Sequence, residues 1–260
     1  MRIAIFTEED YTFMFRSYSR LVADLVAQGH TVVGLFTLPP KLGKYKNFNI
    51  YIYYLKTFGP IVFFKLGYAA INERLKQLYR SILSKEPFTY RTLSAQHGID
   101  FKKINNPNDD AVVDWVEKNN VDVILSTHGF IIKEPLLAAV RQAILNKHSA
   151  ILPSFRGLFP VFWAMLKMGS IGTTVHRMDK TVDTGEILYQ KLYSPLESPS
   201  VFCYYKKIFD ELGESFLTSL KILNAQASKV ELNTNTTASY FSLPTKADYQ
   251  EFKNRRLKFI

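Results

Sequence analysis

The chain has 260 residues, of which 47% are hydrophobic and 22% are charged, an ordinary globular mixture that excludes wholesale disorder. Its length fits one large domain, or one domain with an appendage. Lys and Arg outnumber Asp and Glu by 33 to 23, and this excess favours an anionic partner: nucleic acid, a phosphorylated metabolite or a membrane surface.

Three features of the sequence point to a reduced, cytoplasmic compartment. The longest uninterrupted apolar stretch, residues 158–166, is far shorter than the ~20 residues that span a bilayer, so we expect no membrane span. Residues 8–10 are all carboxylates, where a signal peptide needs its apolar core. The one cysteine, Cys203, permits no internal disulfide and no thiolate zinc cluster.

The N-terminal segment predicts a strand, a helix and a second strand, over residues 2–6, 16–28 and 31–36. Gly29 stands where a helix-ending glycine belongs. This pattern implies a parallel sheet with helices on its faces. The loop after the first strand has no glycine, whereas a dinucleotide-binding turn needs glycines there, so the sequence argues against an NAD or FAD site.

The rest of the chain continues the alternation of helices and strands. We predict further strands at residues 101–104, 121–126, 143–148, 173–176 and 187–190, the last two joined as a hairpin. Helices are expected at residues 60–83, 109–118, 135–140, 160–168 and 200–223, the last as one long amphipathic helix. Residues 225–239 are polar and are interpreted as a linker, and Thr245 with Asp248 predicts a capping box that opens a terminal helix.

Two polar clusters in the second half of the chain carry residue types suited to catalysis. Asn146 and His148 are two apart in a predicted strand, so both side chains point to the same face at its carboxyl end, where open parallel sheets bind ligands. An amide donor and an imidazole there can hold an oxyanion and carry a proton, or they can simply satisfy backbone groups of the loop. The second cluster, residues 176–185, has a histidine and two aspartates around a tight turn, and without cysteines or a second spaced histidine it does not predict a metal site.

The two clusters and the segment between them form an ordered string of motifs: Asn146-x-His148, Leu152-Pro153-x-x-Arg156-Gly157, Pro160-x-x-Trp163-Ala164 and His176-x-Met178-Asp179-x-x-x-Asp183-Thr184-Gly185. This string resembles the folate-dependent formyltransferase family over most of residues 122–190. Three stretches, 54–60, 156–163 and 241–245, are more similar to its sugar N-formyltransferase branch than to its tRNA branch. The resemblance implies an α/β fold with a Rossmann-like parallel-sheet core, at residues 1–185, and a C-terminal β-hairpin and helical extension packed on it, at residues 186–260.

The resemblance also implies roles for particular residues. The catalytic set is Asn146, His148 and Asp183, and no metal is expected. The formyl donor is 10-formyltetrahydrofolate, and its binding residues correspond to Phe130, Ile131, Ile132, Ile151, Leu152, Asp179 and Thr181. For the acceptor, a nucleotide-linked amino sugar, we expect contacts from Glu9, Tyr11 and Arg156.

Three functions remain open on the sequence. The first is N-formylation of a nucleotide-linked amino sugar, as in the synthesis of bacterial O-antigen. The second is a methionyl-tRNA formyltransferase-like activity, although only about 70 residues follow the hairpin, so we do not expect a nucleic-acid partner. The third is a non-catalytic basic protein that binds a membrane surface or nucleic acid. The aromatic residues at 41–91 either wall the acceptor site or cover the sheet edge, and the stripe at 200–223 is either core or the surface of a homodimer.

Overall fold

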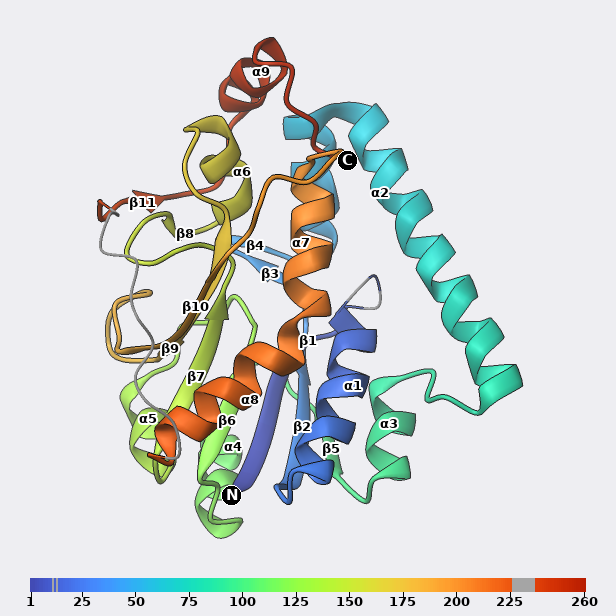
Figure 1. The fold of residues 1–260 in the computed structure, drawn as a ribbon. Coiled ribbons are helices and arrows are strands. Elements are labelled where there is room, and N and C mark those ends of the chain that lie inside the picture. Colours follow the sequence, from blue (N-terminus) through green and yellow to red (C-terminus); the bar gives the residue numbers. More distant parts are fainter. Residues whose placement is uncertain (11, 13, 226–236) are drawn as a thin grey trace.

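A computed structural model describes residues 1–10, 12, 14–225 and 237–260 (Figure 1). Its centre is a seven-stranded sheet in the order β10-β9-β7-β6-β1-β2-β5. The strands from β7 to β5 are parallel, and β9 and β10 are antiparallel to their neighbours. The seven strands are β1 (Arg2–Glu8), β2 (Thr31–Leu38), β5 (Asp100–Lys103), β6 (Val123–Ser126), β7 (Ala143–His148), β9 (Gly172–Arg177) and β10 (Ile187–Leu192).

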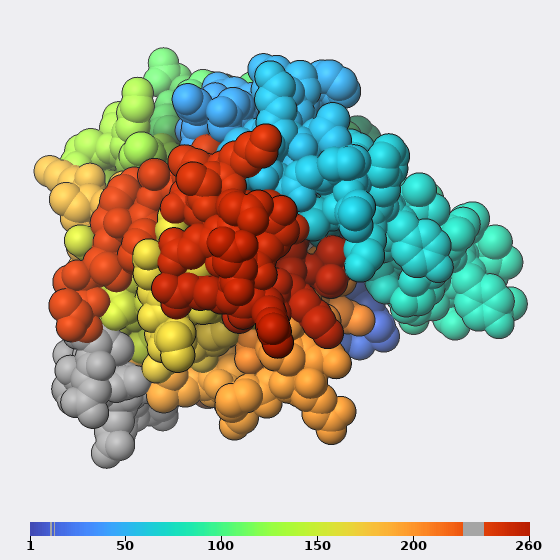
Figure 2. Space-filling model, turned by 90° about the horizontal axis from the view of Figure 1, so that it is seen from above, coloured from blue at the N-terminus to red at the C-terminus, as the bar shows by residue number. Residues whose placement is uncertain are grey.

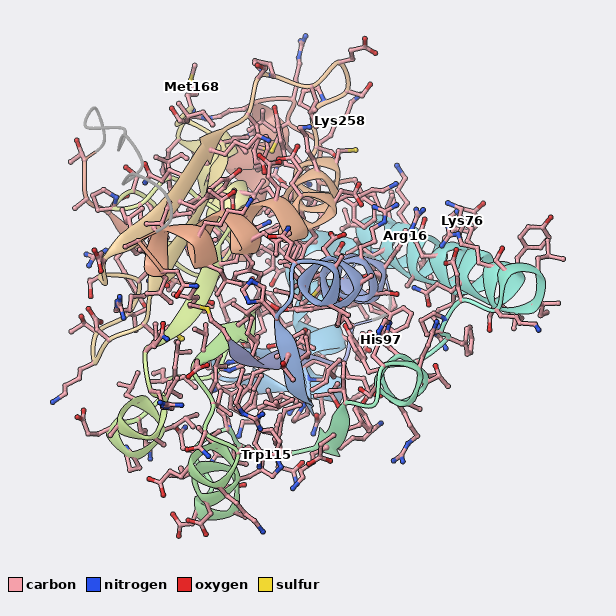
Figure 3. The ribbon with its side chains drawn as sticks, turned by 60° about the horizontal axis from the view of Figure 1, so that its bottom comes forward. Arg16, Lys76, His97, Trp115, Met168 and Lys258 are labelled. Carbon is pink, nitrogen blue, oxygen red and sulfur yellow. The ribbon has the colours of Figure 1, made fainter. Side chains whose placement is uncertain are left out.

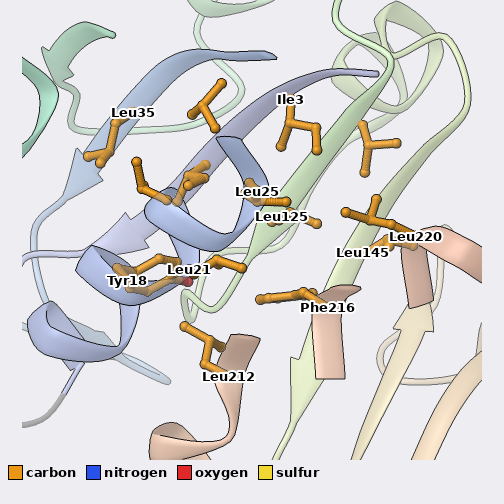
Figure 4. Close-up of a cluster of buried hydrophobic side chains, with 14 of the residues drawn as sticks. Ile3, Tyr18, Leu21, Leu25, Leu35, Leu125, Leu145, Leu212, Phe216 and Leu220 are labelled. Carbon is orange, nitrogen blue, oxygen red and sulfur yellow. The ribbon is translucent and has the colours of Figure 1, made fainter. Parts of the chain in front are cut away.

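Helices cover both faces of the sheet, as the sequence predicted. Side chains of β1 alternate between the two faces, so Ile3 and Ile5 join one core cluster while Ala4 and Phe6 join the other. The first cluster packs against α1 (Met14–Ala27), α3 (Tyr90–Gln96) and α8 (Leu212–Leu223). Figure 4 shows Tyr18 and Leu21 of α1 beside Leu212 and Phe216 of α8. The second cluster packs against α4 (Asp110–Lys118) and α5 (Glu134–Ala139).

A third cluster lies beyond the carboxyl ends of the parallel strands (Figure 1). It is rich in aromatic side chains and joins the start of α2 (Phe48–Ser84) to α6 (Pro160–Leu166), α7 (Val201–Asp210) and α9 (Lys246–Asn254). The capping box of Thr245 and Asp248 opens α9 as predicted.

The single long helix predicted over residues 200–223 is wrong, because the structure breaks it at Glu211 into α7 and α8. The two halves belong to different cores. Ile208 of α7 packs in the aromatic cluster, whereas Leu212 and Phe216 of α8 pack on the sheet. The carboxylate of Glu211 is held at the break by Lys191 and Lys207, each 3.1 Å away.

Residues 41–91 combine a small hairpin with one very long helix. The hairpin is β3 (Lys41–Leu42) with β4 (Tyr45–Lys46), and α2 then runs through 37 residues with a kink at Gly59. Gly59 takes a positive φ of 82°, and Pro60 follows at the start of the next helical turn, where a missing N–H is tolerated. In the described ranges, no helix combines the length and apolar character needed to cross a membrane.

The aromatic residues of this region divide between two environments. Tyr53 and Phe58 are buried against Phe159 in the aromatic cluster, so these two are core residues, although they do not cover the edge of the central sheet. In contrast, Phe64 and Tyr68 are exposed.

A two-stranded parallel pairing that the sequence did not predict ties the C-terminal segment to the core. It joins β8 (Arg156–Gly157) to β11 (Tyr240–Phe241). Of the predicted linker, residues 226–236 lie outside the described residues. The proposed division at residue 185 stays a prediction, and β10, which follows that position, is hydrogen-bonded to β9 within the central sheet.

Candidate active site

The sheet itself brings Asn146, His148 and His176 together. Asn146 and His148 lie at the carboxyl end of β7 and point to the same face, as the sequence predicted. The antiparallel strand β9 lies beside β7 in a register that places His176 directly opposite Asn146. Two strands that are hydrogen-bonded to each other therefore present three polar side chains at one edge of the sheet.

Asp183 reaches this group from the turn between β9 and β10. Its backbone takes a positive φ of 54°, and Gly185 follows where a Cβ would lie 1.8 Å from the carbonyl oxygen of Arg177. Asp183 Oδ2 accepts a hydrogen bond from the Gly157 amide at 2.9 Å and lies 3.6 Å from His148 Nδ1. Its Oδ1 lies 3.5 Å from His176 Nε2. The structure thus brings the predicted catalytic set together.

The hydrogen bonds of His148 determine which of its nitrogens can exchange a proton. Nε2 lies 2.8 Å from the carbonyl oxygen of Phe155, which can only accept, so Nε2 carries a hydrogen. Nδ1 is therefore the nitrogen that titrates, and it faces Asp183. Burial lowers the pKa of His148, while the Asp183 carboxylate and the Phe155 carbonyl act in the opposite direction. A ring that is neutral at physiological pH has Nδ1 available as a proton acceptor.

His176 positions the amide of Asn146. Its Nδ1 donates to the carbonyl of Arg177 at 3.1 Å, so in the neutral ring Nε2 is an acceptor. That Nε2 lies 3.2 Å from Asn146 Nδ2. One amide hydrogen of Asn146 is then held by His176, and the other is free to meet an oxygen in the cavity.

Asp183 is held as a carboxylate. Burial by itself raises the pKa of this group, but the neighbouring His148 and His176 and the hydrogen bond from the Gly157 amide together lower it well below the usual range for aspartate. The side chain is only 11% exposed, so these contacts act with little screening by solvent. A fixed negative charge beside His148 favours the imidazolium form once the ring has taken a proton.

These side chains open onto a cavity of about 480 Å³. Of the residues predicted to bind the donor, Phe130, Ile131, Ile132, Asp179 and Thr181 line this cavity. Asp179 is locked by hydrogen bonds from the Thr181 amide and hydroxyl, at 2.8 and 2.9 Å, which shape the loop that carries Asp183.

Several other predicted residues do not line this cavity. Ile151 and Leu152 are buried in the loop that follows β7. Glu9 forms an ion pair with Lys103 at 2.7 Å on the edge strand, and Arg156 lies in β8, beside the cavity residue Gly157. Tyr11 lies outside the described residues.

His128 is a cavity residue that the sequence analysis missed. Its Nδ1 accepts the Phe130 amide at 3.1 Å, so its Nε2 carries the hydrogen, and this buried N–H has no partner among the described residues. Burial lowers the pKa of His128 to about 4, which keeps the ring neutral. His128 follows the end of β6 by two residues and lies at the same sheet edge as Asn146. Inspection of the polar residues just after each predicted parallel strand would therefore have identified it.

Glu8, at the end of β1, supports the wall of this cavity from behind. Its Oε1 accepts the amides of Gly129 and Lys41, at 2.9 and 3.3 Å, and thereby fixes two backbone segments of the cavity wall. Burial raises the pKa of Glu8 to about 7. Among the described residues, no three His, Cys, Asp or Glu side chains are arranged to hold a metal ion.

Comparison with known proteins agrees with this geometry. The family model for formyl transferases matches residues 73–218, more than half of the chain, and the chain therefore belongs to the formyl transferase family. A methionyl-tRNA formyltransferase from Desulfotalea psychrophila is 31% identical over 96 residues, which are 36% of this chain and 29% of that protein. Another, from Agathobacter rectalis, is 24% identical over 152 residues, which are 58% of this chain and 49% of that protein. The chain thus spans between about a third and a half of the length of these curated relatives.

Solved structures of the same fold cover more of the chain. A sugar N-formyltransferase from a Shewanella species is 16% identical and covers 93% of this chain and 76% of that chain, with a TM-score of 0.55. Phosphoribosylglycinamide formyltransferase from Bacillus halodurans is 18% identical, covers 88% and 97%, and has a TM-score of 0.57. A sugar 3N-formyl transferase, determined in the presence of dTDP and 5-N-formyl-THF, is 13% identical, covers 93% and 69%, and has a TM-score of 0.55. At these identities the likeness confirms the predicted fold.

Proposed function

We propose that this protein is an N-formyltransferase that moves the formyl group of 10-formyltetrahydrofolate to the amine of a nucleotide-linked amino sugar, such as a dideoxy sugar of a bacterial polysaccharide. The observation that carries the proposal is the convergence of Asn146, His148 and Asp183 on one wall of a cavity, in a chain of the formyl transferase family.

The three side chains provide what acyl transfer to an amine requires. As the amine nitrogen attacks the formyl carbon, negative charge develops on the formyl oxygen, and the free N–H of Asn146 stabilises it. Nδ1 of His148 takes the proton that the attacking nitrogen loses, and Asp183 stabilises the imidazolium. When the bond from carbon to the donor nitrogen breaks, His148 returns that proton to the leaving nitrogen. Bonds and charges balance without any further reactant.

The cavity fits a folate-sized donor. Its volume of about 480 Å³ lies within the range of roughly 300–1,000 Å³ that is usual for small-molecule sites. Phe130 and Ile132 supply an apolar wall, and the N–H of His128, which none of the described residues accepts, supplies a buried hydrogen-bond donor. These residues, with Asp179 and Thr181, would hold the donor, which supplies the formyl group.

The proposed acceptor follows from the sequence resemblance and from the comparisons. The sugar branch is favoured by the sequence resemblance and by the two sugar formyltransferases of similar fold, one of them determined with dTDP. Methionyl-tRNA is the second candidate, because the curated relatives named above are methionyl-tRNA formyltransferases.

A screen of acceptors tests both candidates. Purified protein is incubated with 10-formyltetrahydrofolate and a panel of nucleotide-linked amino sugars, or with methionyl-tRNA, and products are read by the mass of one added formyl group. Formylation of an amino sugar supports the proposal. Formylation of methionyl-tRNA alone, with binding that weakens steeply as salt rises, would replace it with the second candidate. Absence of any formyl transfer, with the donor bound, would overturn both.

A further inference from the structure

The outer face of α2 carries an exposed apolar stripe. Its members recur at intervals of three and four residues, so they share one side of the helix. Between 43% and 73% of each of these side chains is exposed: Ile61, Phe64, Tyr68, Ile71, Leu75 and Leu78. Ile82 continues the series at 70%. We call this set, from Ile61 to Ile82, the α2 stripe.

Exposed large hydrophobic residues are concentrated on α2. Of the 18 large hydrophobic residues that are exposed among the described residues, 12 lie on α2. The helix packs on β4 and α9 near its start, and Figures 1 and 2 show the part after the kink projecting from the body of the protein. A contiguous exposed apolar face of roughly 30 Å, the length of 22 helical residues, marks an interaction surface.

The charges around the α2 stripe are mostly positive. Lys65 and Lys76 are exposed beside it, and Lys76 is seen on the projecting part of α2 in Figure 3. The one carboxylate between Ile61 and Ile82 belongs to Glu73, which is 19% exposed and bound to Lys76 at 2.8 Å. Arg74 and Arg80 add two further cations to the sequence of this part of α2.

We propose that the α2 stripe binds an anionic lipid surface, with the helix lying in the plane of the membrane interface. An apolar face flanked by cations, with two aromatic rings among its members, is the pattern of helices that lie in an interface without crossing it. The lipid tails accept the apolar side chains, and the negative headgroups meet the lysines.

A second copy of the chain fits the same face less well. Spacing of three and four also suits a pair of helices, but such pairs are stabilised by opposite charges along their edges. Glu73 is the one carboxylate in α2 and is already bound to Lys76, so a second copy of the helix offers no carboxylate to face Lys65. A helix pair would therefore bring like charges together, whereas an anionic surface pairs with them.

Vesicle flotation with the whole protein tests this proposal. Vesicles of phosphatidylcholine alone are compared with vesicles that contain 30% phosphatidylglycerol, a composition taken as roughly that of an anionic leaflet. We expect the protein to float with the anionic vesicles and much less with the neutral ones. Binding should weaken as salt rises, because screening shortens the reach of the lysines.

Two variants separate the apolar from the electrostatic contribution. Phe64→Gln/Ile71→Gln/Leu75→Gln should lower the partition coefficient at least tenfold, because each removes a large apolar side chain from the stripe. The matched control, Val26→Gln/Met168→Gln/Leu192→Gln, changes three exposed apolar residues outside α2 and should bind like the wild type. Lys65→Gln/Lys76→Gln should weaken binding to anionic vesicles by roughly fivefold or more, and the control Lys118→Gln/Lys133→Gln should not.

The outcomes that contradict the proposal are distinct. No flotation with anionic vesicles, or an equal loss in the apolar control, overturns it. A wild-type dimer in sedimentation velocity that the stripe variant converts to a monomer, without flotation, assigns the face to a second copy instead. Thermal unfolding of each variant checks that the fold is kept, and formyl transfer does not enter the measurement.

Discussion

The cavity and the α2 stripe both depart from the usual distribution of side chains, because the cavity buries a charged group and the stripe exposes apolar ones. In the cavity, the charged Asp183 is only 11% exposed, and its carboxylate lies beside two histidines and accepts the Gly157 amide. On α2, the apolar Ile71 is 61% exposed. A buried carboxylate is stable only if the fold supplies partners for its charge. Exposed apolar side chains make few contacts within the molecule, so the stability of the fold does not depend on them. The first region should therefore be sensitive to substitution, and the second should matter only to an external partner.

The largest expected effect comes from Asp183. Asp183→Asn keeps the shape but removes the charge that stabilises the His148 imidazolium, so we expect kcat for formyl transfer to fall roughly 1,000-fold while the protein stays folded. The matched control is Glu186→Gln, an exposed carboxylate in the same hairpin, which should stay near the wild type. Steady-state kinetics with the acceptor found in the screen provide the measurement. Near-normal turnover of Asp183→Asn would remove this residue from the catalytic set.

Asn146 tests the oxyanion role separately. Asn146→Ala removes one donor, and loss of such a donor lowers kcat by about 100- to 1,000-fold. The Michaelis constants should change much less, because the lost hydrogen bond forms as charge develops on the oxygen. A rise in the Michaelis constant with unchanged kcat would instead make Asn146 a binding residue.

Gly157 lines the cavity and pairs with Phe241 of β11. Its φ is +93°, and a Cβ there would lie 2.3 Å from the carbonyl oxygen of Phe241 in β11. Gly157→Ala should lower the free energy of unfolding by about 1–3 kcal/mol, because the pairing of β8 with β11 has to shift. Urea unfolding measures this, and Gly67→Ala, where a Cβ meets nothing within 4 Å, is the control. Equal stability of the two variants would show that β8 and β11 accommodate the added Cβ without loss of stability.

Glu8, behind the cavity wall, predicts a pH-dependent contribution to the free energy of unfolding. Its pKa is raised to about 7 from the ordinary 4.5 by burial, so the folded protein holds a proton that the unfolded chain loses as pH rises. The contribution of Glu8 to stability should therefore fall between about pH 4.5 and 7. Glu8→Gln should match the wild type near pH 4.5 and exceed it by roughly 1–3 kcal/mol at pH 8. A difference in unfolding free energy that does not change with pH would contradict this account.

The smallest effect is expected on α2. The triple Gln variant of the stripe should change the free energy of unfolding by no more than about 0.5 kcal/mol, since surface substitutions away from packed contacts rarely do more. Its turnover on soluble substrates should stay within about twofold of the wild type. A large loss of stability in the isolated protein would mean that the α2 stripe packs within the molecule, and would remove the contrast between the two regions.

The sequence by itself determined most of the elements around the site. The sequence predicted β7 at its observed bounds, and the period of two along a strand placed Asn146 and His148 on one face. The turn residues from Asp183 to Gly185 predicted the hairpin between β9 and β10. These features depend on neighbours along the chain, so local spacing contains enough information to identify them.

Only the tertiary structure decided the remaining features. The pairing of β8 with β11 joins residues about 84 positions apart, and no local pattern specifies such a partner. The break at Glu211 arises because one amphipathic stripe is divided between two cores, and His128 enters the site because adjacent parallel strands end at the same edge. The stripe from Ile61 to Ile82 has the same spacing as a core-facing helix. Its exposure follows from the path of α2 away from the body, because hydrophobic spacing shows that residues share a face but not what that face meets.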